Sequence, residues 1–227
     1  MIKKTSLKHQ DQKFYLMSFR REIKSTLNKS KLSTLTRWIF DNNGKVLFPE
    51  RIVNSIYFDN KNLNMFYDSV EGILPRKKIR LRIYKSNNTI KYFKDQGALE
   101  YKISSVEGRF KISKNSFDKN KNKPIYFLRD KDYGICNPVL KVAYLRTYYR
   151  IKGIRLTIDK SIQYNKINFS KILPNTIKDN LNVVELKYSN KNDDTNVLNS
   201  FPFQFNRFSK YCRGIEFTKK KYCDENI

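Results

Sequence analysis

The segment Lys77-Lys78-Ile79-Arg80-Leu81-Arg82-Ile83-Tyr84 is the most informative of the chain, because basic and apolar side chains alternate along most of it. Successive side chains of a β-strand point to opposite faces of a sheet, so Arg80 and Arg82 point the same way. This period of two predicts a strand with one basic face and one apolar face.

Five further segments also read as strands with charged side chains on one alternating face: 20–24, 99–102, 144–147, 154–159 and 184–187. Polar faces of this kind usually meet water on the outside of an antiparallel sheet. If the six faces instead converge, they line a strongly cationic cavity with few carboxylates. Such a cavity suits a polyanion with many phosphates and a bound metal ion.

Strand and turn signals in the rest of the chain complete the predicted architecture. They predict strands at 14–24, 51–59, 90–94, 98–104, 108–113 and 182–188, a turn at 87–88, a hairpin over 139–164 that turns near Lys152-Gly153, and helices at 26–40, 62–70, 126–128, 192–200 and after Pro202, including 209–211. Many short strands favour an α+β fold with a closed antiparallel β-barrel and flanking helices. No linker divides the chain, so residues 1–227 are predicted as one domain, with flexible tails at 1–12 and 219–227.

The charge of the chain points to an anionic partner. The 227 residues carry a formal net charge of +26, and 39% of them are hydrophobic, which is enough for a core. Nucleic acid, an anionic membrane surface and polyphosphate all fit this charge. Arginine is the more informative base, because it recurs in the predicted strands and its forked guanidinium matches phosphate oxygens two at a time.

Several reaction classes are excluded by what the sequence lacks. The single histidine, His9, lies in the predicted tail, so neither phosphohistidine chemistry nor a Ser-His-Asp triad can be built. No GxxxxGK[ST] loop is present. Three cysteines without metal-ligand spacing predict free thiols in a reducing cytoplasm. No secretory signal and no apolar stretch of membrane-spanning length is found, so we predict a cytoplasmic protein.

Glu185 is the best candidate metal ligand of the sequence. Mg²⁺ and Mn²⁺ prefer carboxylate and phosphate oxygens, and Glu185 lies on a predicted basic strand face beside Lys187. The competing interpretation is an ordinary Glu–Lys pair, which contributes little. Glu22 and Glu100 fit that competing interpretation better than Glu185 does.

The order and the residues of these segments resemble the VTC domain, the polyphosphate polymerase branch of the triphosphate tunnel metalloenzymes. The segments that carry the resemblance are Phe19-Arg20-Arg21-Glu22-Ile23-Lys24, Ser55-Ile56-Tyr57-Phe58-Asp59, Arg76 to Tyr84, Leu99-Glu100-Tyr101-Lys102, Tyr144-Leu145-Arg146-Thr147, Arg155-Leu156-Thr157-Ile158-Asp159, Val184-Glu185-Leu186-Lys187-Tyr188 and Phe208-Ser209-Lys210-Tyr211. They run in order from about residue 14 to residue 216. Each is weak alone, and their order makes the resemblance specific.

The resemblance implies a tunnel with basic walls and outer helices. It also implies growth of a polyphosphate chain from the terminal phosphate of ATP, assisted by a divalent metal, usually Mn²⁺ with Mg²⁺ as the alternative. Arg80 and Arg82 match the pair that grips the transferred phosphate, and Glu185 matches the metal carboxylate. The other implied site residues are Lys24 and Lys102 beside the reacting phosphate, and Arg20, Arg109, Arg146, Arg155, Lys187, Arg207 and Lys210 along the phosphate-binding walls.

One departure from the wider superfamily favours synthesis over hydrolysis. Hydrolytic tunnel enzymes resemble an E-x-E-x-K first strand, and here those positions read Arg20, Glu22 and Lys24. A site with fewer carboxylates binds metal less tightly and an anionic chain more tightly.

The predicted partners are ATP and pyrophosphate or polyphosphate, without nucleic acid. A tripolyphosphatase or nucleoside triphosphatase, and a module that only binds polyphosphate or nucleic acid, remain the alternatives.

Overall fold

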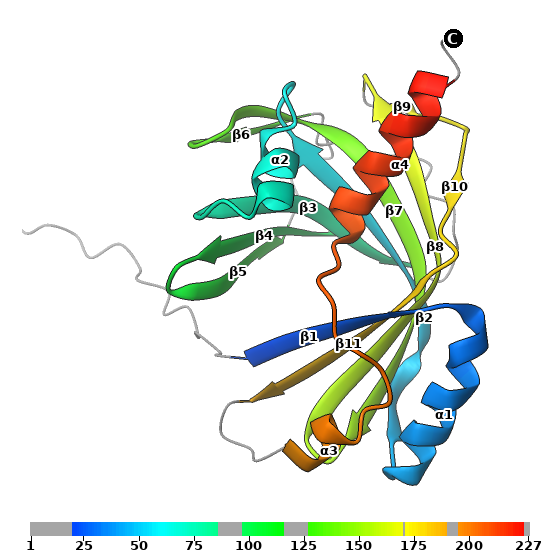
Figure 1. Ribbon diagram of the computed structural model, residues 1–227. Helices are drawn as coiled ribbons and strands as arrows, with labels where there is room; N and C mark the ends of the chain where they lie inside the picture. Colours follow the sequence, from blue (N-terminus) through cyan, green and yellow to red (C-terminus); the bar gives the residue numbers. More distant parts are fainter. Residues whose placement is uncertain (1–19, 86–96, 116–126, 170, 190–194, 225–227) are drawn as a thin grey trace, which may run out of the picture.

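A computed structural model shows an 11-stranded sheet in which all paired strands are antiparallel (Figure 1). It describes residues 20–85, 97–115, 127–169, 171–189 and 195–224. The main path of the sheet runs β1-β11-β8-β7-β2-β3-β4-β5, and the short strands β6, β9 and β10 pair beside it. The sheet therefore places the first strand of the described chain next to the last one.

The bounds of the elements are as follows. The strands are β1 (Arg20–Leu27), β2 (Lys45–Asp59), β3 (Arg76–Lys85), β4 (Ala98–Ser105), β5 (Gly108–Asn115), β6 (Leu128–Asp130), β7 (Gly134–Ile151), β8 (Ile154–Asn168), β9 (Lys171–Ile172), β10 (Ile177–Lys178) and β11 (Asn182–Ser189). The helices are α1 (Leu32–Asp41), α2 (Asn64–Glu71), α3 (Thr195–Asn199) and α4 (Lys210–Asp224), and a 3₁₀ turn precedes α1 at Lys29–Lys31.

The six charged segments all form strands, as the alternation predicts. The long hairpin is also confirmed, because β7 and β8 meet at a two-residue turn. Both turn residues have positive φ, 42° at Lys152 and 86° at Gly153. Such a turn matches the right-handed twist of the flanking strands, which keeps the long hairpin in register.

Several predicted boundaries are wrong. The first helix begins at Leu32 rather than at residue 26, because β1 continues to Leu27, which pairs with Asn182 of β11. Leu128 starts strand β6 instead of ending a helix, because it pairs with Cys136 of β7. The last helix begins at Lys210, so residue 209 precedes it, and it includes residues 219–224 of the predicted tail.

Other differences concern strands that the sequence did not indicate. β2 begins at Lys45, six residues before the predicted strand, and continues through Pro49 with register shifts against β7. Strands β9 and β10 were not predicted. The predicted strand at 90–94, the turn at 87–88 and residues 14–19 of the first predicted strand lie outside the described residues.

The predicted closed barrel is wrong, because the sheet curls into an open half-barrel. In the described part of the chain, β1 and β5 are the two ends of the strand order, and β1/β11 face β4/β5 across the open side (Figure 1). These edge strands have 8 residues each, whereas β2, β7 and β8 have 15, 18 and 15. Short edges that carry Lys and Arg resist further strand pairing, which fits an open form.

Apolar clusters cover both faces of the sheet and leave part of the inner face polar. On the outer face, Leu35 and Trp38 of α1 pack with Ile158 and Leu186. On the inner face, α4 packs against the β7/β8 end in a cluster that includes Leu140, Tyr164, Tyr211 and Ile215. A Cβ at position 214 would lie 2.6 Å from both the Leu140 and the Tyr164 side chains, so glycine there allows the close approach of α4. Helix α4 therefore closes one end of the inner face.

Candidate functional site

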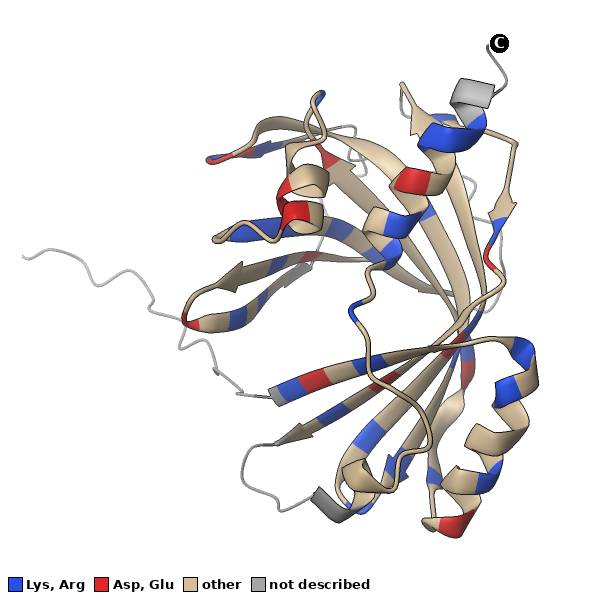
Figure 2. Cartoon of the chain, in the orientation of Figure 1, with Lys and Arg blue, Asp and Glu red and all other residues tan. Residues whose placement is uncertain are grey.

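Strand register gathers charged residues of eight strands on the inner, concave face of the sheet. Figure 2 shows basic and acidic positions along the strands that border the open side. The pairing register places on this face Glu22, Lys24, Arg51, Lys78, Arg80, Arg82, Glu100, Lys102, Arg109, Lys111, Arg146, Arg155, Asp159, Glu185 and Lys187. Cations clearly outnumber carboxylates in this set, so the face favours a polyanion.

The sheet curves so far that charged side chains near its two ends interact electrostatically. Lys102 of β4 interacts electrostatically with Glu22 of β1 and Glu185 of β11. The charge of Arg80 and burial push the pKa of Lys102 well below its ordinary value, although these two carboxylates oppose the shift. The predicted convergence of the basic strands is therefore present, without closure of the barrel.

Arg80 is buried at the centre of this face and bound to Glu100. Its Nε and Nη2 donate to Glu100 Oε2 at 2.7 and 2.5 Å, and its Nη1 donates to the Tyr57 hydroxyl at 3.2 Å. The other Glu100 oxygen lies 2.6 Å from Lys111 Nζ. Glu100, only 3% exposed, therefore joins β3, β4 and β5.

Arg82 lies on the same face and keeps an unused donor. Its Nη2 donates to the Tyr144 hydroxyl at 2.9 Å and its Nη1 reaches the Tyr84 hydroxyl at 3.5 Å. Its Nε is buried and has no hydrogen-bond partner among the described residues; the Glu100 carboxylate is 4.0 Å away. A buried guanidinium with a free N–H is suited to bind a further anion, to which it can donate a hydrogen bond.

We expect Glu100 to make the unfolding free energy sensitive to acid. Burial alone raises its pKa, but Arg80 and Arg82 outweigh burial and lower the pKa from 4.5 to about 2. The resulting stability is present above about pH 4.5 and is lost as the pH falls towards 2, because the unfolded chain then binds the proton more readily. The difference corresponds to about 3 kcal/mol. Urea unfolding between pH 5 and pH 2.5 should show a shallower loss for Glu100→Gln than for the wild type; equal slopes would contradict this.

A second buried cluster joins β7, β8 and α4. Arg146 Nε and Nη2 donate to the two Asp159 oxygens at 2.5 and 2.7 Å, and Lys210 Nζ donates to Asp159 Oδ2 at 2.5 Å. Burial alone raises the pKa of Asp159, but Lys210 and Arg146 lower it below its ordinary value. The carboxylate thus stays ionised and holds both predicted phosphate-binding bases against the inner face.

Two carboxylates converge around one ammonium group on β1 and β11. Lys187 Nζ lies 2.8 Å from Glu185 Oε1 and 3.1 Å from Glu22 Oε2. Lys24 Nζ lies 2.9 Å from the other Glu22 oxygen and donates to the Phe208 carbonyl at 3.3 Å. Burial raises the pKa of Glu22, but with Lys24 and Lys187 beside it the pKa falls to about 2.

The remaining predicted site residues are placed less centrally. Arg155 pairs in register with Lys187 of β11, so the alternation puts it on the inner face at one end. Arg109 on β5 is close enough to act on the charge of Lys24. Arg207 is exposed, and its Nη2 donates to the Ser69 carbonyl of α2 at 2.5 Å, apart from the central clusters. Arg20 begins β1.

Sequence reasoning missed several side chains that hold the bases in place. The strand pattern assigns no role to Asp159, and it favours an ordinary Glu–Lys pair for Glu100. Tyr57 and Tyr144, whose hydroxyls accept from Arg80 and Arg82, were also missed. Strand alternation could have identified them: Asp159 lies on the same strand face as Arg155, and Tyr144 lies on the same face as Arg146.

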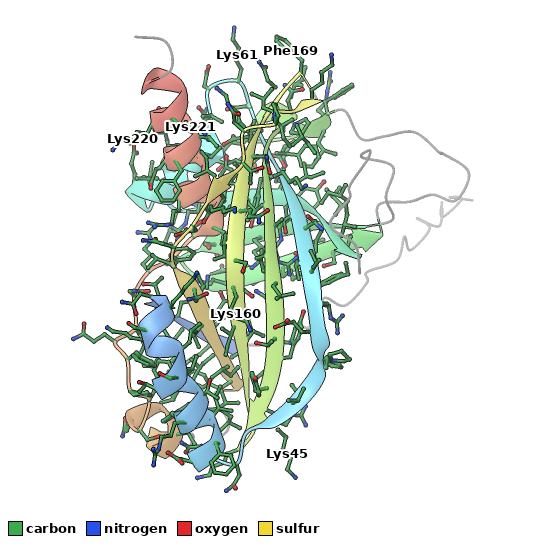
Figure 3. The ribbon with its side chains drawn as sticks, turned by 90° about the vertical axis from the view of Figure 1, so that its right-hand side faces the viewer. Lys45, Lys61, Lys160, Phe169, Lys220 and Lys221 are labelled. Carbon is green, nitrogen blue, oxygen red and sulfur yellow. The ribbon has the colours of Figure 1, made fainter. Side chains whose placement is uncertain are left out.

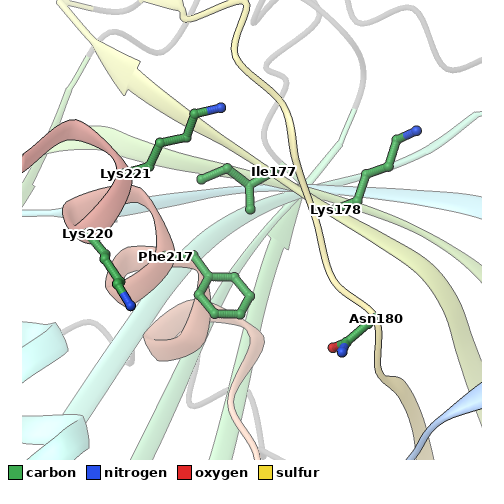
Figure 4. Close-up of a pocket in the computed structure, with 6 residues that line it drawn as sticks. All are labelled: Ile177, Lys178, Asn180, Phe217, Lys220 and Lys221. Carbon is green, nitrogen blue, oxygen red and sulfur yellow. The ribbon is translucent and has the colours of Figure 1, made fainter. Parts of the chain in front are cut away.

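Many other lysines lie outside this face. Lys61, in the turn after β2, and Lys220 of α4 are exposed and point outward (Figure 3). A surface pocket between α4 and the β10 segment is lined by Ile177, Lys178, Asn180, Phe217, Lys220 and Lys221, and contains none of the predicted site residues (Figure 4).

The described part of the chain holds neither a three-ligand metal cluster nor a membrane-spanning helix. Among residues 20–85, 97–115, 127–169, 171–189 and 195–224, no group of three or more His, Cys, Asp or Glu side chains is arranged to hold a metal ion. Over the same ranges, the helices are all too short or too polar to cross a membrane.

Comparison with solved structures finds the same fold in one distant protein and a weaker likeness in two others. A candidate adenylate cyclase from Bacillus halodurans superposes with a TM-score of 0.52 at 10% identity, covering 85% of this chain and 93% of that one. One from Vibrio parahaemolyticus gives 0.48 at 10% identity, covering 85% and 95%. A candidate adenylyl cyclase from Hippeastrum, described as having a dominant triphosphatase activity, gives 0.44 at 12%, covering 84% and 93%. At such identities, the likeness to the Bacillus protein shows the fold alone.

Sequence comparison assigns the family. No curated protein matches the chain. The profile of the VTC domain matches residues 19–219, which is nearly all of the described structure and the same stretch that carries the ordered basic strands. The chain therefore belongs to the VTC domain family.

Proposed function

We propose that this chain is an ATP–polyphosphate phosphotransferase, which moves the γ-phosphate of ATP onto a growing inorganic polyphosphate chain. The observation that carries the proposal is the convergence of buried bases from separate strands on one concave face. Arg80 and Arg82 lie at its centre, and Arg146 and Lys210 are held beside them by Asp159. A row of fixed cations is suited to several linked phosphates at once.

Phosphoryl transfer asks mainly for positioning and charge from the protein. The transition state places negative charge on the equatorial oxygens of the transferred group, and fixed donors stabilise it. In the proposed reaction, Arg82 uses its free Nε and Arg80 supplies a second guanidinium. A terminal phosphate oxygen attacks in line and ADP leaves, so no protein nucleophile is required.

Glu185 and Glu22 fit a divalent metal that keeps other ligands. Their oxygens already converge on one cation, the Lys187 ammonium. Mg²⁺ and Mn²⁺ sites commonly combine one or two carboxylates with water and substrate phosphates, which is consistent with two protein ligands here. When bound, such an ion neutralises phosphate charge. We propose that these two residues hold it, with Lys187 turning towards the phosphates.

The state of the carboxylates supports transfer to phosphate rather than to water. Nearby bases lower the pKa of Glu22, Glu100, Asp159 and Glu185, although burial opposes each shift. A general base works best with a pKa near the operating pH, so these are weak bases for activating water. A terminal phosphate is already anionic and needs no such activation.

The products formed from ATP test the proposal. Purified protein with ATP and Mn²⁺ should release ADP and form long polyphosphate on a gel, and Glu185→Gln should lower the rate at a fixed metal concentration. Glu216→Gln, at an exposed position of α4, is the matched surface control and should leave the rate unchanged. ADP with orthophosphate as the sole second product would contradict the proposal and favour a triphosphatase of the same fold.

A further inference from the structure

Three aromatic rings and an arginine form a cluster at one end of the concave face. The guanidinium of Arg51 lies 5.3 Å from the ring centre of Phe48, 5.6 Å from that of Tyr84 and 5.0 Å from that of Tyr148. The Phe48 and Tyr148 rings meet edge to face at 5.6 Å. The register shifts in β2 around residues 46–51 allow Phe48 to pair with Tyr148. We call these four residues the aromatic–arginine cluster.

The cluster is continuous with the proposed phosphate-binding arginines. The Arg82 guanidinium lies 5.9 Å from the centre of the Tyr84 ring, and that of Arg146 lies 6.0 Å from the centre of the Tyr148 ring. Arg51 also pairs directly with Arg146 in the β2–β7 register. A ligand whose phosphates lie on Arg82 and Arg146, and which extends towards this end of the face, would place its next chemical group at the cluster.

Two of the rings are open to solvent although they lie beside buried arginines. Phe48 is 47% exposed and Tyr84 is 48% exposed, whereas Arg82 is 7% exposed. No carboxylate in the described ranges forms an ion pair with Arg51. Exposed aromatic faces and an unpaired guanidinium plane are surfaces on which a nucleobase stacks.

We propose that the aromatic–arginine cluster is a nucleobase-binding subsite, which makes a nucleoside triphosphate rather than inorganic tripolyphosphate the preferred phosphate donor. This inference deepens the proposed function and rests on it for the position of the phosphates. The base stacks on Phe48, Tyr84 or Arg51, and the triphosphate extends towards Arg82 and Arg80. Stacking tolerates different bases, so ATP and GTP should bind with similar affinity, and purines better than pyrimidines.

Equilibrium binding tests the subsite without turnover. Isothermal titration of the full chain with the β,γ-imido analogue of ATP and with inorganic tripolyphosphate gives two dissociation constants. For the double variant Phe48→Leu with Tyr84→Leu, we expect the dissociation constant of the imido analogue to rise about 10-fold or more, because the nucleobase loses its stacking contact. The dissociation constant of tripolyphosphate should stay within about twofold, because the Arg and Lys side chains that hold phosphate are unchanged.

Matched variants separate stacking from general damage to the fold. Tyr84→Phe keeps the ring and should retain the wild-type ratio of the two constants. Phe169→Leu removes an exposed phenylalanine at the other end of the molecule (Figure 3) and should change neither constant. A 2-aminopurine triphosphate should be quenched on binding the wild type and less so on binding the double variant.

Two results would overturn the inference. One is an unchanged affinity of the double variant for the imido analogue. The other is an equal loss of affinity for both ligands, which would mean that the cluster only supports the strand ends. Neither result depends on whether polyphosphate is made, so failure of the subsite and failure of the proposed reaction are distinguishable.

Discussion

Arg82→Gln should lower kcat for phosphoryl transfer by about 100- to 1000-fold, the loss observed when one fixed donor to a developing charge is removed. Arg82 is chosen because its Nε has no hydrogen-bond partner in the described part of the chain, whereas Arg80 is committed to Glu100. Glu100 keeps both Arg80, at 2.5 Å, and Lys111, at 2.6 Å, in this variant. The melting temperature should therefore stay within a few degrees of the wild type.

The matched control for Arg82→Gln is Lys61→Gln. Lys61 is exposed in the turn after β2 and points outward at one end of the molecule (Figure 3), so the variant removes the same charge without touching the concave face. Steady-state rates with ATP and Mn²⁺ measure both variants. If they lower kcat alike, the net field of the protein rather than the position of Arg82 drives the reaction, and the proposed role is wrong. If the protein only binds polyanions, the two variants should weaken binding equally, because each removes one positive charge.

Asp159→Asn should have the largest effect on stability. Asp159 is fully buried, and it accepts from Arg146 and Lys210. Removal of its charge leaves two inner-face cations without their carboxylate, and breaking a buried pair in this way costs about 3–5 kcal/mol. For a chain of this size the melting temperature should fall by roughly 6–20 °C.

Added polyanion should partly rescue Asp159→Asn. Tripolyphosphate replaces the missing negative charge beside Arg146 and Lys210, so it should raise the melting temperature of the variant more than that of the wild type. Differential scanning calorimetry with and without tripolyphosphate measures this difference. Glu50→Gln is the control, because Glu50 pairs with Lys160 in a half-exposed bridge of 3.1 Å and should cost little. Equal anion stabilisation of all three proteins would show that Asp159 does not organise an anion site.

Much of the fold could be predicted because strand alternation is a local property. The period of two identified the strands around Arg80, Glu100, Arg155 and Glu185, and the structure confirms them. The limits of the elements were harder, because pairing decides them. Leu27 is a strand residue since Asn182 lies opposite, and Leu128 is one since Cys136 does.

The candidate site was predicted as a set of bases but not as an arrangement. The sequence indicates that Arg80 and Arg82 share a face, yet it treats them as equivalent. In the structure, Arg80 is neutralised by Glu100 on the adjacent strand, and Arg82 retains a free donor. That difference depends on the β3–β4 register, in which Arg80 lies opposite Glu100 and Arg82 opposite Ala98.

Three properties follow from the amino-acid sequence alone: which side chains share a strand face, the excess of positive charge, and the order of motifs that marks the VTC domain family. Three others depend on the folded chain: the sheet stays open, Asp159 joins Arg146 to Lys210, and Phe48, Tyr84 and Tyr148 meet around Arg51. The reason is physical: alternation follows from the geometry of one strand, whereas these contacts join residues far apart in the chain. They exist only once register and sheet curvature are set by the packing of all the strands together.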